Sequence, residues 1–111
     1  MNNFHPLESV FNDAIAQATN GKGEERHGQG IPFLEQKWLR LAESHGIGFL
    51  SGQAQKKIEE AMNYYHQFGV KADTEKAWWE REMLGALNYL AMAILYVRIK
   101  EGEYDIHSTG D

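Results

Sequence analysis

Cysteine is absent from the 111 residues of the chain, which excludes disulfide bonds, thiolate metal sites and cysteine nucleophiles. A chain without cysteine is more typical of the cytosol than of small secreted domains, which depend on disulfides. The start of the chain also lacks the basic and apolar runs of a signal peptide. The longest apolar stretch, Leu84 to Val97, is shorter than the roughly 20 residues of a membrane-spanning helix. We therefore expect a cytoplasmic protein with no membrane partner.

An excess of basic charge is also missing. Lysine and arginine number 11 against 16 aspartates and glutamates, which gives a formal net charge of -5. Proteins that bind DNA or RNA usually present a basic face to the phosphates, so the sequence predicts no nucleic-acid partner. A single nucleotide chelated to a divalent ion is still compatible with this charge. The length corresponds to one domain, residues 1–111, which is long enough for one modest core.

The alternation of apolar and polar residues that marks a half-buried strand is absent, whereas helical periodicity occurs in four segments. These segments are residues 6–18, 33–45, 50–68 and 73 to about 100. Pro6 suits a first helical position, Gly69 suits a helix end and Asp73 suits an N-cap. The pattern predicts an all-α fold, a small four-helix bundle-like domain.

Glycine is concentrated between the first two predicted helices. Four glycines fall within residues 21–30, and glycine-rich stretches of this length are either connectors or loops that contact a ligand. We predict a flexible glycine-rich loop over 20–31, with a ligand-contacting loop as the alternative. Residues 102–111 lack periodicity, so we expect this tail to fray.

The fourth predicted helix is apolar nearly all round. One stripe consists of Ala77, Trp78, Leu84, Leu87, Ala91, Ile94 and Arg98, and a second of Met83, Ala86, Leu90, Ala93 and Val97. A helix that is apolar on every side has to be buried on every side, and three shorter helices hardly surround it. We therefore predict a symmetric homodimer formed through this helix. The alternative is that it is the central helix of a monomer.

Carboxylates recur on the third and fourth predicted helices. If these helices pack antiparallel, Glu59 or Glu60 faces Glu82. Carboxylates from two helices of a bundle commonly hold magnesium or manganese, because hard cations prefer oxygen ligands. The alternative is that these side chains form solvated faces together with lysines and arginines.

Two of these segments resemble the MazG-like all-α nucleoside triphosphate pyrophosphohydrolases. The segments are Lys57-Ile58-Glu59-Glu60-Ala61-Met62-Asn63 and Glu82-Met83-Leu84-Gly85-Ala86-Leu87-Asn88-Tyr89-Leu90. That family carries Glu-x-x-Glu on one helix and Glu-x-x-Asp on the next, binds magnesium between them and cleaves nucleotides to the monophosphate and pyrophosphate. The resemblance covers at most residues 33–97, and it implies a helical bundle with a nucleotide site.

The resemblance also implies a set of metal ligands. Glu60 and Asn63 align with the first motif, and Glu82 and Gly85 with the second. A magnesium or manganese ion would thus be held by Glu60, Asn63 and Glu82, with Glu59 as an alternative ligand. Asparagine still offers a carbonyl oxygen, but glycine offers no side-chain ligand, so the predicted metal site is incomplete.

A bound nucleotide would need further contacts. On the nucleotide hypothesis, Lys56 or Arg81 contacts phosphate, and Trp38 or Trp79 packs against the base. The function would then be that of a magnesium- or manganese-dependent pyrophosphohydrolase or of a nucleotide-binding protein.

The incomplete ligand set favours a second hypothesis, a non-enzymatic helical interaction protein on a MazG-like scaffold. Small acidic helical proteins are common in phages and mobile elements, and by analogy we consider such a source for this protein. The partner is then another protein, and an exposed patch that combines Trp79, Tyr64 and Phe49 would support this hypothesis.

Overall fold

The computed structural model describes residues 3–20, 31–68 and 73–102. Within them the chain forms four α-helices, one short 3-10 helix and no strand, so the predicted all-α bundle-like fold is confirmed. The helices are α1 (His5–Asn20), η2 (Phe33–Glu35), α2 (Lys37–His45), α3 (Ile47–Phe68) and α4 (Asp73–Lys100). Most of the predicted glycine-rich loop, residues 21–30, and the tail from residue 103 lie outside the described residues.

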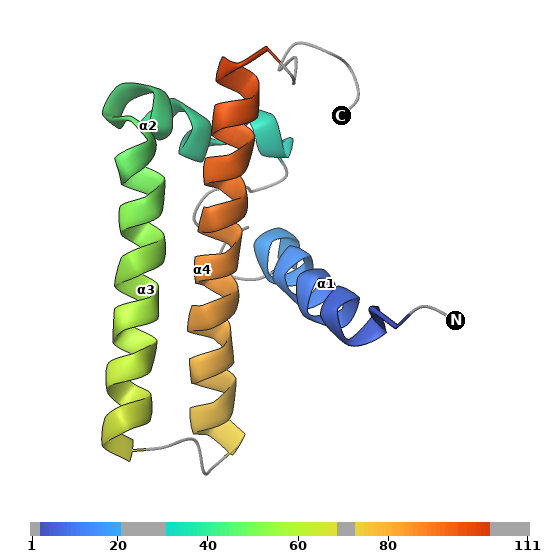
Figure 1. The fold of residues 1–111 in the computed structure, drawn as a ribbon, viewed down its shortest axis with the longest axis vertical. Helices are drawn as coiled ribbons and strands as arrows, with labels where there is room; N and C mark the ends of the chain where they lie inside the picture. The colour runs from blue at the N-terminus through green and yellow to red at the C-terminus, as the bar shows by residue number, and fades with distance from the viewer. Residues whose placement is uncertain (1–2, 21–30, 69–72, 103–111) are drawn as a thin grey trace.

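The second and third predicted helices differ most from the structure. The single helix expected over 33–45 is divided into η2 and α2, because Gln36 has an extended backbone between them. Helix α3 begins at Ile47 and not at residue 50. Gly46 separates α2 from α3 with a φ of 83°, a left-handed value that glycine adopts without strain. The chain therefore turns sharply here, and α3 sets off at a steep angle to α2 (Figure 1).

Helices α3 and α4 run antiparallel side by side along most of their length (Figure 1). The antiparallel packing on which a contact between Glu59 or Glu60 and Glu82 was conditional is therefore present. Small residues on α3 lie at the contact, since Ala54 and Ala61 are both buried. This close pairing brings the polar residues of the two helices within reach of one another.

The main core lies where α2 crosses the C-terminal half of α4. It is built from the buried residues Trp38, Leu39, Ala42, Leu50, Met92 and Tyr96. The Trp38 indole is 1 % exposed, and its Nε1 donates a hydrogen bond of 2.8 Å to the carbonyl oxygen of Phe33. This hydrogen bond ties η2 to α2 and satisfies the one polar atom of the largest core side chain.

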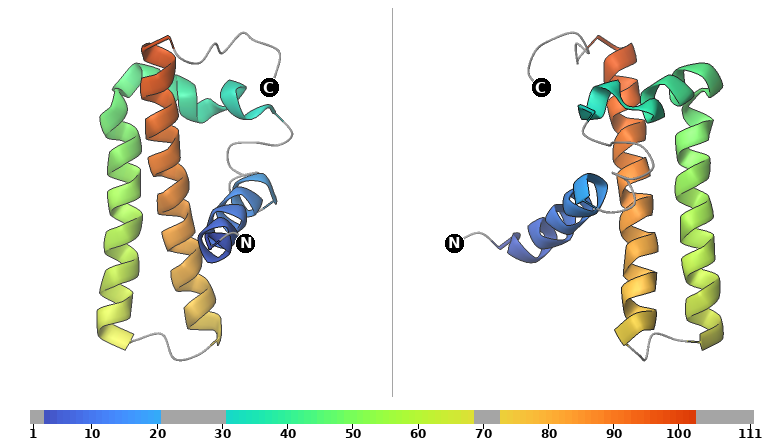
Figure 2. Two further views of the ribbon diagram at one scale, coloured as in Figure 1. Left: turned by 45° about the vertical axis from the view of Figure 1, so that its right-hand side comes forward. Right: turned by 180° about the vertical axis from the view of Figure 1, so that it is seen from behind.

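Helix α1 crosses the middle of α4, and its N-terminal end points away from the bundle (Figure 2). Among the described side chains of α1 only Ala14 is buried. Two hydrogen bonds join the helices: Asn88 Nδ2 donates to the carbonyl oxygen of Ala14, and Gln17 Nε2 donates to that of Arg81, each at 3.0 Å. The apolar residues Leu7 and Ile15 stay exposed, so α1 is docked through a small contact.

Helix α4 contains a segment that is long and apolar enough to cross a membrane. Residues Trp78–Lys100 meet this criterion by length and composition, and 22 % of the most apolar window is buried inside the protein. This segment is longer than the apolar stretch from Leu84 to Val97, from which no membrane-spanning helix was predicted. The core helices of soluble proteins can meet the same criterion, but those are mostly buried. Much of the apolar surface of α4 is thus not covered by the described part of the chain.

Candidate functional site

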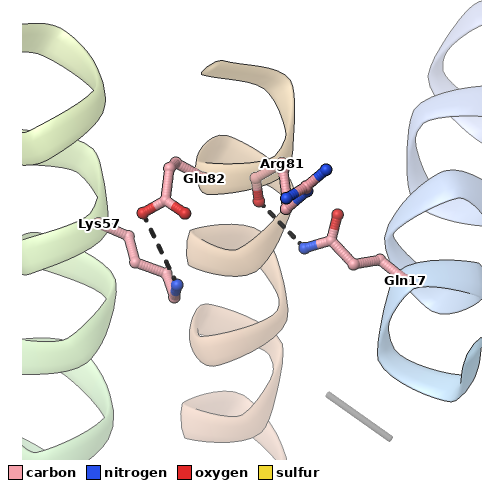
Figure 3. Close-up of polar contacts among 4 residues, drawn as sticks. All are labelled: Gln17, Lys57, Arg81 and Glu82. Atoms are coloured by element: carbon pink, nitrogen blue, oxygen red, sulfur yellow. Dashed lines mark hydrogen bonds and ion pairs between the residues drawn. The ribbon is translucent and has the colours of Figure 1, made fainter. Parts of the chain in front are cut away.

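The polar site between α3 and α4 is centred on Glu82. Its partner on α3 is Lys57, and the Lys57 Nζ lies 3.8 Å from Glu82 Oε1 (Figure 3). The side chains are 24 % and 15 % exposed, respectively, so the pair is partly shielded from water. The carboxylate that the sequence assigned to a metal ion is therefore paired with a cation of the chain itself.

Gly85, one turn after Glu82, makes room for this pair. A Cβ atom at Gly85 would lie 2.9 Å from Lys57 Cδ, 3.1 Å from Cε and 3.4 Å from Nζ. The Lys57 side chain therefore passes directly over the glycine on its way to Glu82. The sequence presented Gly85 as a missing metal ligand, whereas in the structure its lack of a side chain accommodates a lysine.

The remaining predicted metal ligands lie on the exposed surface of α3. Glu59, Glu60 and Asn63 are all exposed, and Glu59 Oε2 accepts a 3.0 Å hydrogen bond from Gln55 Nε2. Within the described residues, no group of three or more histidines, aspartates or glutamates is placed to hold a metal ion. Glu82, Glu59 and Glu60 therefore do not come together as a metal site with three carboxylates.

The predicted nucleotide contacts are also scattered. Lys56 and Arg81 are exposed, and the Arg81 carbonyl is the group that receives Gln17 from α1 (Figure 3). Trp38 is enclosed in the core and leaves no face free for stacking on a base. Trp79 is half-buried and lies on α4, apart from Trp38 on α2.

Aromatic side chains gather where α3 ends and α4 begins. The ring centroids of Tyr64 and Trp78 are 4.7 Å apart, and those of Tyr65 and Trp79 are 6.1 Å apart. The Trp79 Nε1 is buried without a hydrogen-bond partner among the described residues. Phe49 lies at the other end of α3, against the Trp38 core and about 22 Å from Tyr64 along the helix. Trp79, Tyr64 and Phe49 therefore do not form the single exposed patch that would have supported the interaction hypothesis.

Exposed apolar side chains form the largest feature that the sequence did not locate. On α1 they include Leu7, Val10, Phe11 and Ile15, and on α4 they are Leu90, Ile94 and Val97. The all-round apolar pattern of α4 indicated that something covers this helix, but not which side is left open. The periodicity of α1 predicted one apolar face. The rest of the described chain covers only part of this face.

Lys57 was also not predicted from the sequence to belong to the site. It stands next to Lys56, to which the phosphate contact was assigned, and three residues before Glu60. The available signal was its combination with a glycine on the facing helix, since a long side chain needs such a gap to lie flat between two helices.

No family model, no curated protein and no solved structure matches the chain, so the MazG-like relationship stays a prediction.

Proposed function

We propose that the protein is a small helical interaction protein and not a nucleotide hydrolase. The observation that carries this proposal is the row of large apolar side chains left open on α4: Leu90, Ile94 and Val97 are 44 %, 54 % and 42 % exposed. Single exposed apolar residues are ordinary, but a contiguous group on one element is typical of a surface that binds another molecule.

The polar site supports the same proposal. A metal ion held between α3 and α4 would have to displace the Lys57 ammonium group from Glu82, since both cations compete for one carboxylate. Hard divalent cations need several oxygen ligands, and the neighbouring position on α4, Gly85, contributes none. A lysine that already neutralises the carboxylate removes the charge that would attract the ion.

Thermal unfolding with a panel of ribo- and deoxyribonucleoside triphosphates tests the proposal, first with manganese and then with EDTA. A ligand present at about 100 times its dissociation constant stabilises the native state by about 2.7 kcal/mol, which corresponds to roughly 10 °C in a domain of this size. We expect no shift with any nucleotide. A manganese-dependent rise of several degrees with one nucleotide, reversed by EDTA, would overturn the proposal in favour of a pyrophosphohydrolase or a nucleotide-binding protein.

A double variant provides the positive control. Lys57→Ala with Gly85→Asp removes the cation and places a second carboxylate one turn from Glu82. We expect manganese to raise the unfolding midpoint of this variant more than that of the natural chain, because two unpaired carboxylates attract a divalent ion. If the variant responds and the natural chain does not, the assay is sensitive enough for the negative result to count.

A further inference from the structure

Five apolar residues follow the open side of α4 at alternating steps of four and three residues. They are Met83, Leu87, Leu90, Ile94 and Val97, and we call them the outer stripe. The first two are half-buried and the last three exposed. Leu90 and Ile94 each stand two residues from the buried Met92, which places them about 160° from it around the helix. The outer stripe therefore faces away from the core.

The spacing of the outer stripe is that of a helix seam that packs against a second helix. Steps of four and three average 3.5 residues, the repeat with which two helices keep contact along their length. No described helix of the same chain covers this side, since Leu90, Ile94 and Val97 are all exposed. The sequence pattern and the exposure thus both indicate a missing partner helix.

We propose that this partner is α4 of a second copy, packed antiparallel about a twofold axis at Leu90. The proposal rests on the interaction function and identifies its partner. The ends of the stripe are equidistant from Leu90, since Met83 and Val97 lie seven residues to either side, whereas Leu87 and Ile94 lie three and four residues away. In an antiparallel pair Leu90 therefore meets its own counterpart, while Met83 lies opposite Val97 of the second copy.

The charges beside the outer stripe complement one another in this arrangement. Glu80 and Arg98 are both exposed and stand about five helical turns apart, so they lie on the same flank of the stripe. Neither forms an ion pair within the described residues. The twofold axis brings Glu80 of each copy to within about 3 Å, along the helix, of Arg98 of the other. A parallel pair would leave these charges about 27 Å apart along the helix.

A second copy fits this surface better than a membrane does. Helix α3 lies along α4 and carries the exposed charges of Lys56, Glu59 and Glu60. If α4 crossed a bilayer with α3 attached, these charges would enter hydrocarbon, where charged side chains are strongly disfavoured. A helix that covers only the outer stripe leaves α3 in water. Because the stripe is about 21 Å long, the interface is small, and we expect a dissociation constant in the micromolar range.

Sedimentation equilibrium of the full chain tests the proposal over a concentration range from about 1 to 500 µM, which brackets that constant. We expect a reversible monomer–dimer equilibrium. Leu90→Glu places two carboxylates against each other at the axis and should raise the dissociation constant about 100-fold or more. Ile47→Glu is the matched control, since Ile47 is also 44 % exposed but lies at the start of α3. That variant should leave the constant within about threefold of the natural value.

Charge exchange tests the antiparallel register. Glu80→Arg or Arg98→Glu alone turns both symmetric ion pairs into repulsions, and we expect the dissociation constant to rise about 5- to 30-fold. The double variant restores both pairs with reversed sign and should return to within about threefold of the natural value. Far-UV circular dichroism of each variant checks that the helices are intact, so that loss of folding is not read as loss of the dimer.

A cysteine scan gives an independent measurement, because the chain has no cysteine of its own. Leu90→Cys at the twofold axis should form an intermolecular disulfide on mild oxidation, whereas Tyr65→Cys, exposed near the end of α3, should not. Strong cross-linking through position 65 with none through position 90 would place the contact elsewhere and refute the proposal.

Three outcomes overturn the dimer. The first is a chain that is monomeric at every concentration, and the second is a dimer that Leu90→Glu leaves intact. The third is a monomer that floats with vesicles of phosphatidylcholine and phosphatidylglycerol, which would make the partner a lipid surface. If the chain is a monomer and does not respond to nucleotides, the proposed dimer is refuted but the proposed interaction function is not. A manganese-dependent nucleotide response removes the interaction function whether or not the dimer forms.

Discussion

Replacing Gly85 by alanine has two opposing effects on stability, because it raises helix propensity and disturbs the contact with Lys57. Alanine in a helix interior is about 1 kcal/mol more favourable than glycine. The new methyl carbon would lie 2.9 Å from Lys57 Cδ, which forces the lysine side chain to move. That side chain is flexible, and its ion pair with Glu82 is partly exposed to solvent, so losing the pair costs about 0.5 kcal/mol. We expect Gly85→Ala to raise the free energy of unfolding by about 0.5 kcal/mol.

The same substitution in a Lys57→Ala background isolates the contact. Without the lysine side chain nothing needs to move, so the full gain of about 1 kcal/mol should appear. The difference between the two backgrounds, about 0.5 kcal/mol, is the coupling energy of the contact. Urea unfolding followed by far-UV circular dichroism measures all four chains, at one protein concentration because self-association stabilises the native state.

A loss of more than about 1 kcal/mol from Gly85→Ala in both backgrounds would refute this reasoning. It would mean that the glycine accommodates something other than the lysine side chain. A gain of about 1 kcal/mol in both backgrounds would instead show that Lys57 moves aside without cost, and that the ion pair with Glu82 contributes nothing to stability.

Two further substitutions test the packing. Trp38→Ala should lower the free energy of unfolding by about 3–5 kcal/mol, because the indole is fully enclosed and its Nε1 binds the Phe33 carbonyl; an effect below about 1 kcal/mol in urea unfolding would contradict the observed core. Asn88→Ala should cost about 1 kcal/mol through loss of the hydrogen bond to Ala14. Asn63→Ala, at an exposed position, is its control and should stay within about 0.5 kcal/mol of the natural chain.

The fold could be predicted from the sequence because its signals are local. Periodicity over a dozen residues or more predicted the four helices. The extended backbone of Gln36 was not predicted, since it goes with side-chain hydrogen bonds between residues five apart. The Gln36 side chain donates to the carbonyl oxygen of Ile31 and Trp38 donates to that of Phe33. Both contacts fold the chain back on itself, and periodicity does not report them.

The candidate site was harder to predict, because it depends on which faces of two helices meet. Glu82 lies between α3 and α4, where the antiparallel arrangement considered for these helices would place it. Its partner was sought among Glu59 and Glu60, but the rotation of α3 turns those two outward and brings Lys57 inward. A single residue step rotates a helical side chain by about 100°. Spacing alone therefore could not distinguish a pair of carboxylates from a carboxylate and a lysine.

The shallow docking of α1 has a consequence for the motions of the chain. Among the described side chains of this helix only Ala14 is buried, and hydrogen bonds from Asn88 to Ala14 and from Gln17 to Arg81 join it to α4, while α3 and α4 pack against each other along most of their length. Most of the stability of a helix in a protein comes from tertiary packing, so α1 tends to unwind once it leaves α4. Opening of α1 therefore requires only a fraction of the free energy of global unfolding. Its backbone amides should exchange with solvent while those of the α3–α4 pair are still protected.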